Sequence, residues 1–90
     1  MNNPQIRSYA RAFAQKLLHD CGNGEPQSVN RAYQLALGRK PDATESKNAS
    51  AFIKTQAESY NAQGKSDAQE LALADFCQVL FGLNEFIYLE

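Results

Sequence analysis

The feature that most constrains this fold is the segment 67–81, which is apolar over most of its circumference when it is drawn as a helix. Its apolar residues are Leu71, Leu73, Ala74, Phe76, Cys77, Val79 and Leu80. A helix that is apolar on several sides is normally packed by neighbours all round. The segment therefore predicts a central helix in an all-α fold, with the other helices arranged around it.

Three further segments, 4–20, 27–37 and 43–62, carry apolar residues at the three- and four-residue spacing of one helical face. The residues expected to face inward are Ile6, Tyr9 or Ala10, Phe13 and Leu17 in the first, Val29, Ala32, Tyr33, Ala36 and Leu37 in the second, and Ala49, Phe52, Ile53, Ala57 or Gln56, and Tyr60 in the third. No strand alternation of useful length occurs. We therefore predict that residues 1–90 form one domain, a compact four-helix bundle.

The connection "GRKPD" between the second and third helices is the best specified in the chain. Gly38 can take a positive φ and end one helix, Pro41 blocks continuation, and Asp42 can cap the next helix. Asp42 with Glu45 three residues later resembles a capping box. Arg39 can reach either the last carbonyls of the second helix or Glu45. These residues predict a structural corner.

A second capping box is predicted at the start of the fourth helix. Ser66 and Gln69 have the required three-residue spacing. Asp67 and Glu70 lie where negative charge is favoured by the helix dipole. Asp75, farther along this apolar helix, is interpreted as making a structural hydrogen bond or lying exposed, rather than as a functional carboxylate.

The chain ends with the apolar tail "LNEFIYLE". Burial of a large apolar side chain stabilises a fold by up to about 1.5–3 kcal/mol, so we expect Phe86 and Tyr88 to pack over the bundle. An exposed docking patch is the alternative. Asn84 can cap a final turn, which would insert Phe86 between the fourth and first helices. The residues expected around it are Phe13, Leu17 or Phe76.

The residues with the strongest chemistry do not form a recognisable site. His19, Cys21 and Cys77 match no standard zinc framework, and no CxxCH haem motif is present. On a helix His19 and Cys21 point about 200° apart, so they cannot act as base and nucleophile. We predict no cofactor, no metal and no enzymatic activity. The two cysteines permit one disulfide or two free thiols.

The charge balance does not favour a nucleic-acid or membrane partner. The formal net charge is −1, and no apolar run approaches the roughly 18–20 residues that span a bilayer. The basic residues Arg7, Arg11, Arg31, Arg39 and Lys40 are balanced by Asp20, Glu25, Asp42 and Glu45. Such a surface is usually solvated and self-paired. We predict no nucleic-acid binding, no membrane span, and a monomer.

Two stretches resemble one known family. "RAYQLALGRKPDATE", residues 31–45, is similar to a "RAY-x-LALGR-x-P-x-x-x-E" segment, and residues 71–90 are similar to a closing "ALAD-x-C-x-x-LL-N-x-NEF-x-Y" pattern. The chain thereby resembles the C-terminal part of a planctomycete-specific domain of unknown function, planctomycete-specific domain one, found in large proteins with cytochrome-c-like domains. Phe81-Gly82-Leu83 departs from the leucine and small polar residues that are commoner there.

The resemblance implies context rather than chemistry, because the family has no established activity. It implies an exported parent protein at the cell envelope, with this piece at its C-terminus; Met1 can then be an added start and Leu89-Glu90 a cloning junction. The expected role is a structural or interaction module that packs against the rest of its parent or a protein partner. The alternative is an accessory helical domain of an enzyme or electron-transfer protein whose active site lies elsewhere.

Overall fold

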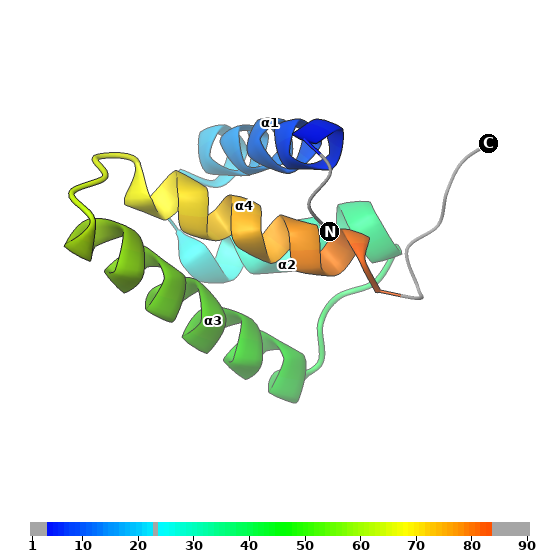
Figure 1. Ribbon diagram of the computed structural model, residues 1–90. Helices are drawn as coiled ribbons and strands as arrows, with labels where there is room; N and C mark the ends of the chain where they lie inside the picture. Colours follow the sequence, from blue (N-terminus) through cyan, green and yellow to red (C-terminus); the bar gives the residue numbers. More distant parts are fainter. Residues whose placement is uncertain (1–3, 23, 84–90) are drawn as a thin grey trace.

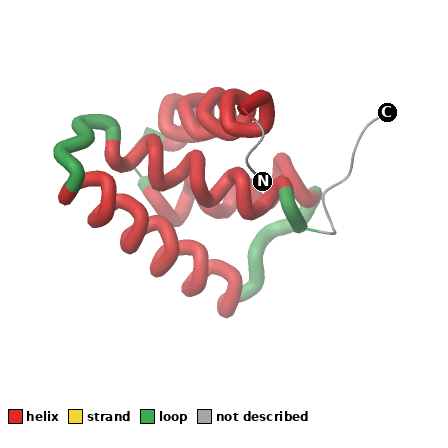
Figure 2. Tube along the Cα trace, in the orientation of Figure 1, coloured by secondary structure: helices red, strands yellow, loops and turns green. Residues whose placement is uncertain are grey.

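The computed structural model describes residues 4–22 and 24–83, and these form four helices without a strand (Figure 1). The helices are α1 (Pro4–Cys21), α2 (Glu25–Leu37), α3 (Ala43–Ala62) and α4 (Ala68–Phe81). Short connections join them, as the green segments of Figure 2 show. The predicted all-α four-helix bundle is confirmed. The predicted tail residues Asn84, Phe86 and Tyr88 lie outside the described residues.

Helix α4 occupies the centre of the bundle, as its apolar circumference predicts. In Figure 1 it runs between α1 and α3, and it packs mainly against these two helices and less extensively against α2. Within the described ranges, the backbones of α1 and α3 do not come close to each other. The buried residues of α4 are Ala68, Leu71, Ala72, Leu73, Ala74, Phe76, Cys77 and Leu80. Their number and spread explain why α4 needs neighbours on several sides.

The face that α1 turns toward the core resolves one choice that the sequence left open. Ala10 is fully buried with Leu17, whereas Tyr9 is 56% exposed. The small side chain of Ala10 lets α1 lie close to the core of the bundle, whereas the Tyr9 side chain points away from the core. On the flank, the ring of Phe13 stacks on that of Phe81, with centroids 5.7 Å apart. This aromatic pair contributes about 0.5–1.5 kcal/mol beyond its buried area.

The corner between α2 and α3 has the predicted geometry. Gly38 has φ 73°, and its N–H donates to the Gln34 carbonyl at 3.0 Å. The Asp42 carboxylate accepts the Glu45 N–H at 2.8 Å, and the Glu45 carboxylate accepts the Asp42 N–H at 2.9 Å. The capping box is therefore complete, and it supplies partners for two backbone N–H groups at the start of α3.

Arg39 and Pro41 complete this corner. Pro41 lies in the connection, after α2 has ended. The Arg39 guanidinium donates to both carboxylate oxygens of Glu45, at 2.8 and 2.9 Å, and lies 5.6 Å from the centroid of the Tyr33 ring. Of the two partners predicted for Arg39, the structure selects Glu45. The hydrogen bonds from Arg39 and from the Asp42 backbone lower the pKa of Glu45 to about 2.

The capping box predicted at Ser66 and Gln69 is wrong. Helix α4 begins one residue later than predicted, with Asp67 as the N-cap (φ −104°, ψ 33°), and no side chain forms a cap hydrogen bond there. Arg11 of α1 instead binds the two acidic side chains of this turn. Its guanidinium donates to Glu70 Oε2 at 2.7 and 3.0 Å and to Asp67 Oδ2 at 3.3 Å. A tertiary ion pair thus holds the first turn of α4 where a local cap was expected.

Candidate functional site

Asp75, on α4, joins three helices through its carboxylate. Its side chain is only 15% exposed. Oδ1 accepts a hydrogen bond from Arg7 of α1 at 2.7 Å, and Oδ2 accepts one from Gln56 of α3 at 2.8 Å. The Tyr60 hydroxyl, also on α3, lies 3.1 Å from Oδ1 and 2.9 Å from Oδ2. Asp75 therefore links α1 to α3, whose backbones do not come close to each other.

The donors around Asp75 satisfy its charge within the protein. Arg7 supplies the compensating positive charge and also donates to Gln78 Oε1 at 2.9 Å. Burial, followed by the hydrogen bond to Asp75, raises the pKa of Tyr60, so this hydroxyl stays a neutral donor. With its oxygens engaged by three side chains, Asp75 is a structural group. Of the two alternatives left by the sequence, the hydrogen-bonded one is confirmed.

The partners of Asp75 were not identified from the sequence. Tyr60 was expected to face inward, and Gln56 was an alternative to Ala57, but neither was connected to Asp75. The sequence did contain a signal, namely polar side chains on otherwise apolar helix faces. Gln56 and Tyr60 are four residues apart on α3, and Asp75 and Gln78 are three residues apart on α4. Pairing these sets requires the helix arrangement, which the sequence alone does not provide.

Self-pairing is confirmed for three arginines, although mostly with partners other than those expected. Arg7 pairs with Asp75, Arg11 with Glu70 and Asp67, and only Arg39 with a predicted neighbour, Glu45. Asp20 instead lies 3.1 Å from Lys16 and 3.3 Å from His19. Hydrogen bonding to Lys16, then to His19, lowers the pKa of Asp20.

The two cysteines are free thiols at opposite ends of the bundle. Arg7 pairs with Asp75 while Arg11 pairs with Glu70, so α1 and α4 run antiparallel. Cys21 follows Arg7 by 14 residues, or about 21 Å along the helix, which takes it away from Cys77. Burial raises the pKa of Cys77 to about 12, so its thiol is inert and packs as a small apolar group.

An apolar groove of about 300 Å³ opens between α2, α3 and α4. Its lining residues are Tyr33, Glu45, Asn48, Ala49, Phe52, Phe76 and Val79. Phe76 and Ala49 form a buried floor, whereas Phe52 is half-buried and Val79 is 49% exposed. The Tyr33 and Phe76 rings pack with centroids 6.1 Å apart. The apolar groove thus presents aromatic and aliphatic surface within walls that other contacts hold in place.

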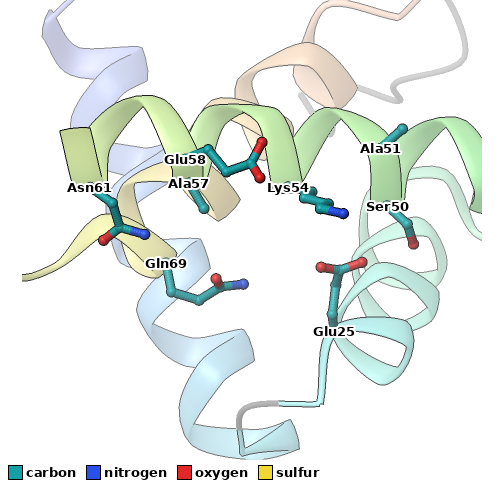
Figure 3. A pocket seen from close by; sticks show the side chains of 8 residues that line it. All are labelled: Glu25, Ser50, Ala51, Lys54, Ala57, Glu58, Asn61 and Gln69. Atoms are coloured by element: carbon teal, nitrogen blue, oxygen red, sulfur yellow. The ribbon is translucent and has the colours of Figure 1, made fainter.

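A second, polar hollow of about 350 Å³ lies on the face formed by α3 and the starts of α2 and α4. Its lining residues are Glu25, Ser50, Ala51, Lys54, Ala57, Glu58, Asn61 and Gln69, and Figure 3 shows the charged ends of Glu25 and Lys54 on the same side of it. Lys54, Glu58 and Gln69 are exposed to solvent. Mixed charges at such positions make a solvated face, so the apolar groove is the stronger candidate for a binding site.

Neither a metal centre nor a bilayer span is present in the described part of the chain. No three His, Cys, Asp or Glu side chains of residues 4–22 and 24–83 are grouped as metal ligands. The helices over the same ranges are too short or too polar to cross a bilayer. Comparison with known proteins gives no relative: no family model, no curated protein and no solved structure matches the chain.

Proposed function

We propose that this chain is a structural or protein-interaction module whose apolar groove takes up an apolar segment of protein. The observation that supports this is the groove itself. Its floor is formed by apolar side chains, and its edge carries Val79, which is 49% exposed. An aliphatic residue at the edge of an apolar hollow gains from being covered by protein.

The walls of the groove favour binding because they are already ordered. The Tyr33 ring packs against the Phe76 ring and lies beside the Arg39 guanidinium. The hydrogen bonds from Gln56 and Tyr60 of α3 to Asp75 of α4 hold together the two helices that supply most of the groove lining. A segment that enters a pre-formed groove does not have to order the receptor, so more of the binding free energy is retained. At about 300 Å³ the groove suits a few large side chains.

The family resemblance supports a location for this role. A C-terminal module of an exported envelope protein would use such a groove to pack against another segment of its parent. We propose accordingly that the chain is a non-enzymatic domain; the resemblance that supports this rests on the two sequence motifs alone.

Photo-crosslinking tests this proposal. A benzophenone amino acid is placed at Val79 or, as a matched control, at Leu35. Both residues are third from the end of their helix, and they are 49% and 45% exposed. In the full-length protein we expect the Val79 probe to crosslink to one apolar segment, identified by mass spectrometry, while the Leu35 probe does not. Equally unspecific products from both positions would overturn the proposal.

A further inference from the structure

We propose that the protein segment bound in the apolar groove is an amphipathic α-helix. Its apolar stripe, with side chains three or four residues apart, fills the groove, and a lysine or arginine on its flank lies beside Glu45. The inference rests on the proposed function, because it names the kind of segment that the groove takes up. It is carried by the backbone of the walls, by the shape between α3 and α4, and by the charge on the lining.

The walls of the groove offer no hydrogen-bonding edge to an extended segment. Every described lining residue belongs to a helix: Tyr33 to α2, four residues between Glu45 and Phe52 to α3, and Phe76 and Val79 to α4. Backbone groups inside a helix are bonded within that helix, and strand addition needs an exposed sheet edge. An extended segment would therefore bury its own N–H and C=O groups on apolar side chains without partners, which is unfavourable. A helix avoids this loss, because it satisfies its backbone groups internally.

The groove lies where α3 and α4 separate. Figure 1 shows the two helices diverging from the connection that joins them. Near this connection the Asp75 carboxylate bonds Gln56 and Tyr60, in the second half of α3. The groove is lined instead by the first half of α3, which contributes Phe52, and by the second half of α4, which contributes Val79. A channel between two diverging helices accepts the side-chain ridge of a third helix, and residues at spacings of three and four form such a ridge.

The charge on the lining favours a basic residue on the flank of the bound helix. Among the described lining residues only Glu45 is charged, and its partner Arg39 is not part of the lining. Oε1 of Glu45 accepts from Arg39 and from the Asp42 N–H, whereas Oε2 accepts, among the described residues, from Arg39 alone. Each carboxylate oxygen has two acceptor sites. Oε2 can therefore accept one more hydrogen bond from a lysine or arginine, and an acidic residue in that place would be repelled.

An isotope-labelled peptide tests the inference. The segment that crosslinks to the Val79 probe in the full-length protein is synthesised as a labelled peptide and added to the 90-residue chain. We expect its Cα chemical shifts to move downfield on binding, as in a helix. A proline in the middle of the segment should weaken binding at least about tenfold, because proline breaks a helix. Upfield Cα shifts, typical of an extended chain, or a peptide that does not bind would overturn the inference while the proposed function stands. If the Val79 probe crosslinks to no segment, both fall.

Matched variants test the site and its charge. Val79→Asp places a charge at the half-exposed edge of the groove and should abolish binding of the peptide, whereas Leu35→Asp, at the matched position, should leave the affinity unchanged. Replacement of the basic residue on the flank of the peptide by glutamine should weaken binding about twofold to fivefold. This loss should disappear in the Glu45→Gln protein. A segment without a basic flank, or an equal loss in both proteins, would overturn the placement beside Glu45 that the proposal specifies.

Discussion

Arg7 Nη1 lies 2.7 Å from Asp75 Oδ1 although 68 residues separate them in the chain. The pair fixes α1 on α4, and the same carboxylate binds Gln56 of α3. Both side chains are largely shielded from water, at 31% and 15% exposure. Removal of the Asp75 carboxylate leaves its donors short of an acceptor in a poorly hydrated place, which costs more than an exposed ion pair contributes.

Replacement of Asp75 by alanine should therefore destabilise the bundle. We expect Asp75→Ala to lower the free energy of unfolding by about 2–3 kcal/mol, because Arg7, Gln56 and Tyr60 all lose an acceptor. Urea denaturation measures the change. Glu58→Ala, on the exposed face of α3, is the control and should stay within about 0.5 kcal/mol of the parent. Equal midpoints for the two variants would show that the Asp75 cluster contributes little.

Replacing Gly38 should lower stability through the backbone conformation alone. A Cβ added at Gly38 would meet no atom within 4 Å, but φ is 73°. Gly38→Val should lower the free energy of unfolding by about 1–2 kcal/mol, because a β-branched residue tolerates this conformation poorly. Gly38→Asn should cost less, since asparagine enters the left-handed region more readily. Thermal denaturation of both variants checks the order, and an equal loss for both would contradict it.

Replacing Ser28 should make the protein more stable. Its side-chain oxygen is buried in α2 and has no hydrogen-bond partner among the described residues. Ser28→Ala removes this desolvated hydroxyl and should raise the free energy of unfolding by about 1 kcal/mol. Ser8→Ala, at an exposed position of α1, reports the gain from helix propensity alone and should be smaller. Destabilisation by Ser28→Ala would show that the hydroxyl has a partner.

Glu45 predicts a dependence of stability on pH. Hydrogen bonds from Arg39 and the Asp42 backbone lower its pKa from 4.5 to about 2. A lowered pKa in the folded state means that the stabilisation is complete above about pH 4.5 and is lost as the pH falls toward 2. The melting-temperature difference between the parent and Glu45→Gln should therefore be largest at neutral pH and shrink toward pH 2. For Glu58→Gln the difference should change less over this range; a constant Glu45→Gln difference would contradict the ion pair.

Features that depend on neighbours in sequence were predictable. Gly38, Arg39, Asp42 and Glu45 lie within eight consecutive residues, so their types and spacing specify the corner. The Ser66 prediction relied on the same local logic and was wrong. There Arg11, more than fifty residues away, binds the first-turn carboxylates of α4.

In the candidate site, too, the local features were predictable from the sequence and the long-range ones were not. Its apolar lining residues were predictable as parts of apolar helix faces, since Phe52 and Phe76 follow the helical period. The groove itself, however, forms because the side chains of α2, α3 and α4 leave a space between them. That space depends on the distances and angles between the helices. The half-exposed Val79 at its edge could not be distinguished from the buried residues beside it in the sequence.

The central position of α4 has a consequence during synthesis on the ribosome. Both α1 and α3 make most of their contacts with α4, which is the last of the four helices to be translated. Until then the nascent chain carries the apolar faces around Leu17 and Ile53 without the helix that covers them. The exit tunnel must therefore release residues up to about Phe81 before the bundle can close. Such a bundle closes in one late step, and the apolar faces of α1 and α3 stay uncovered until that point.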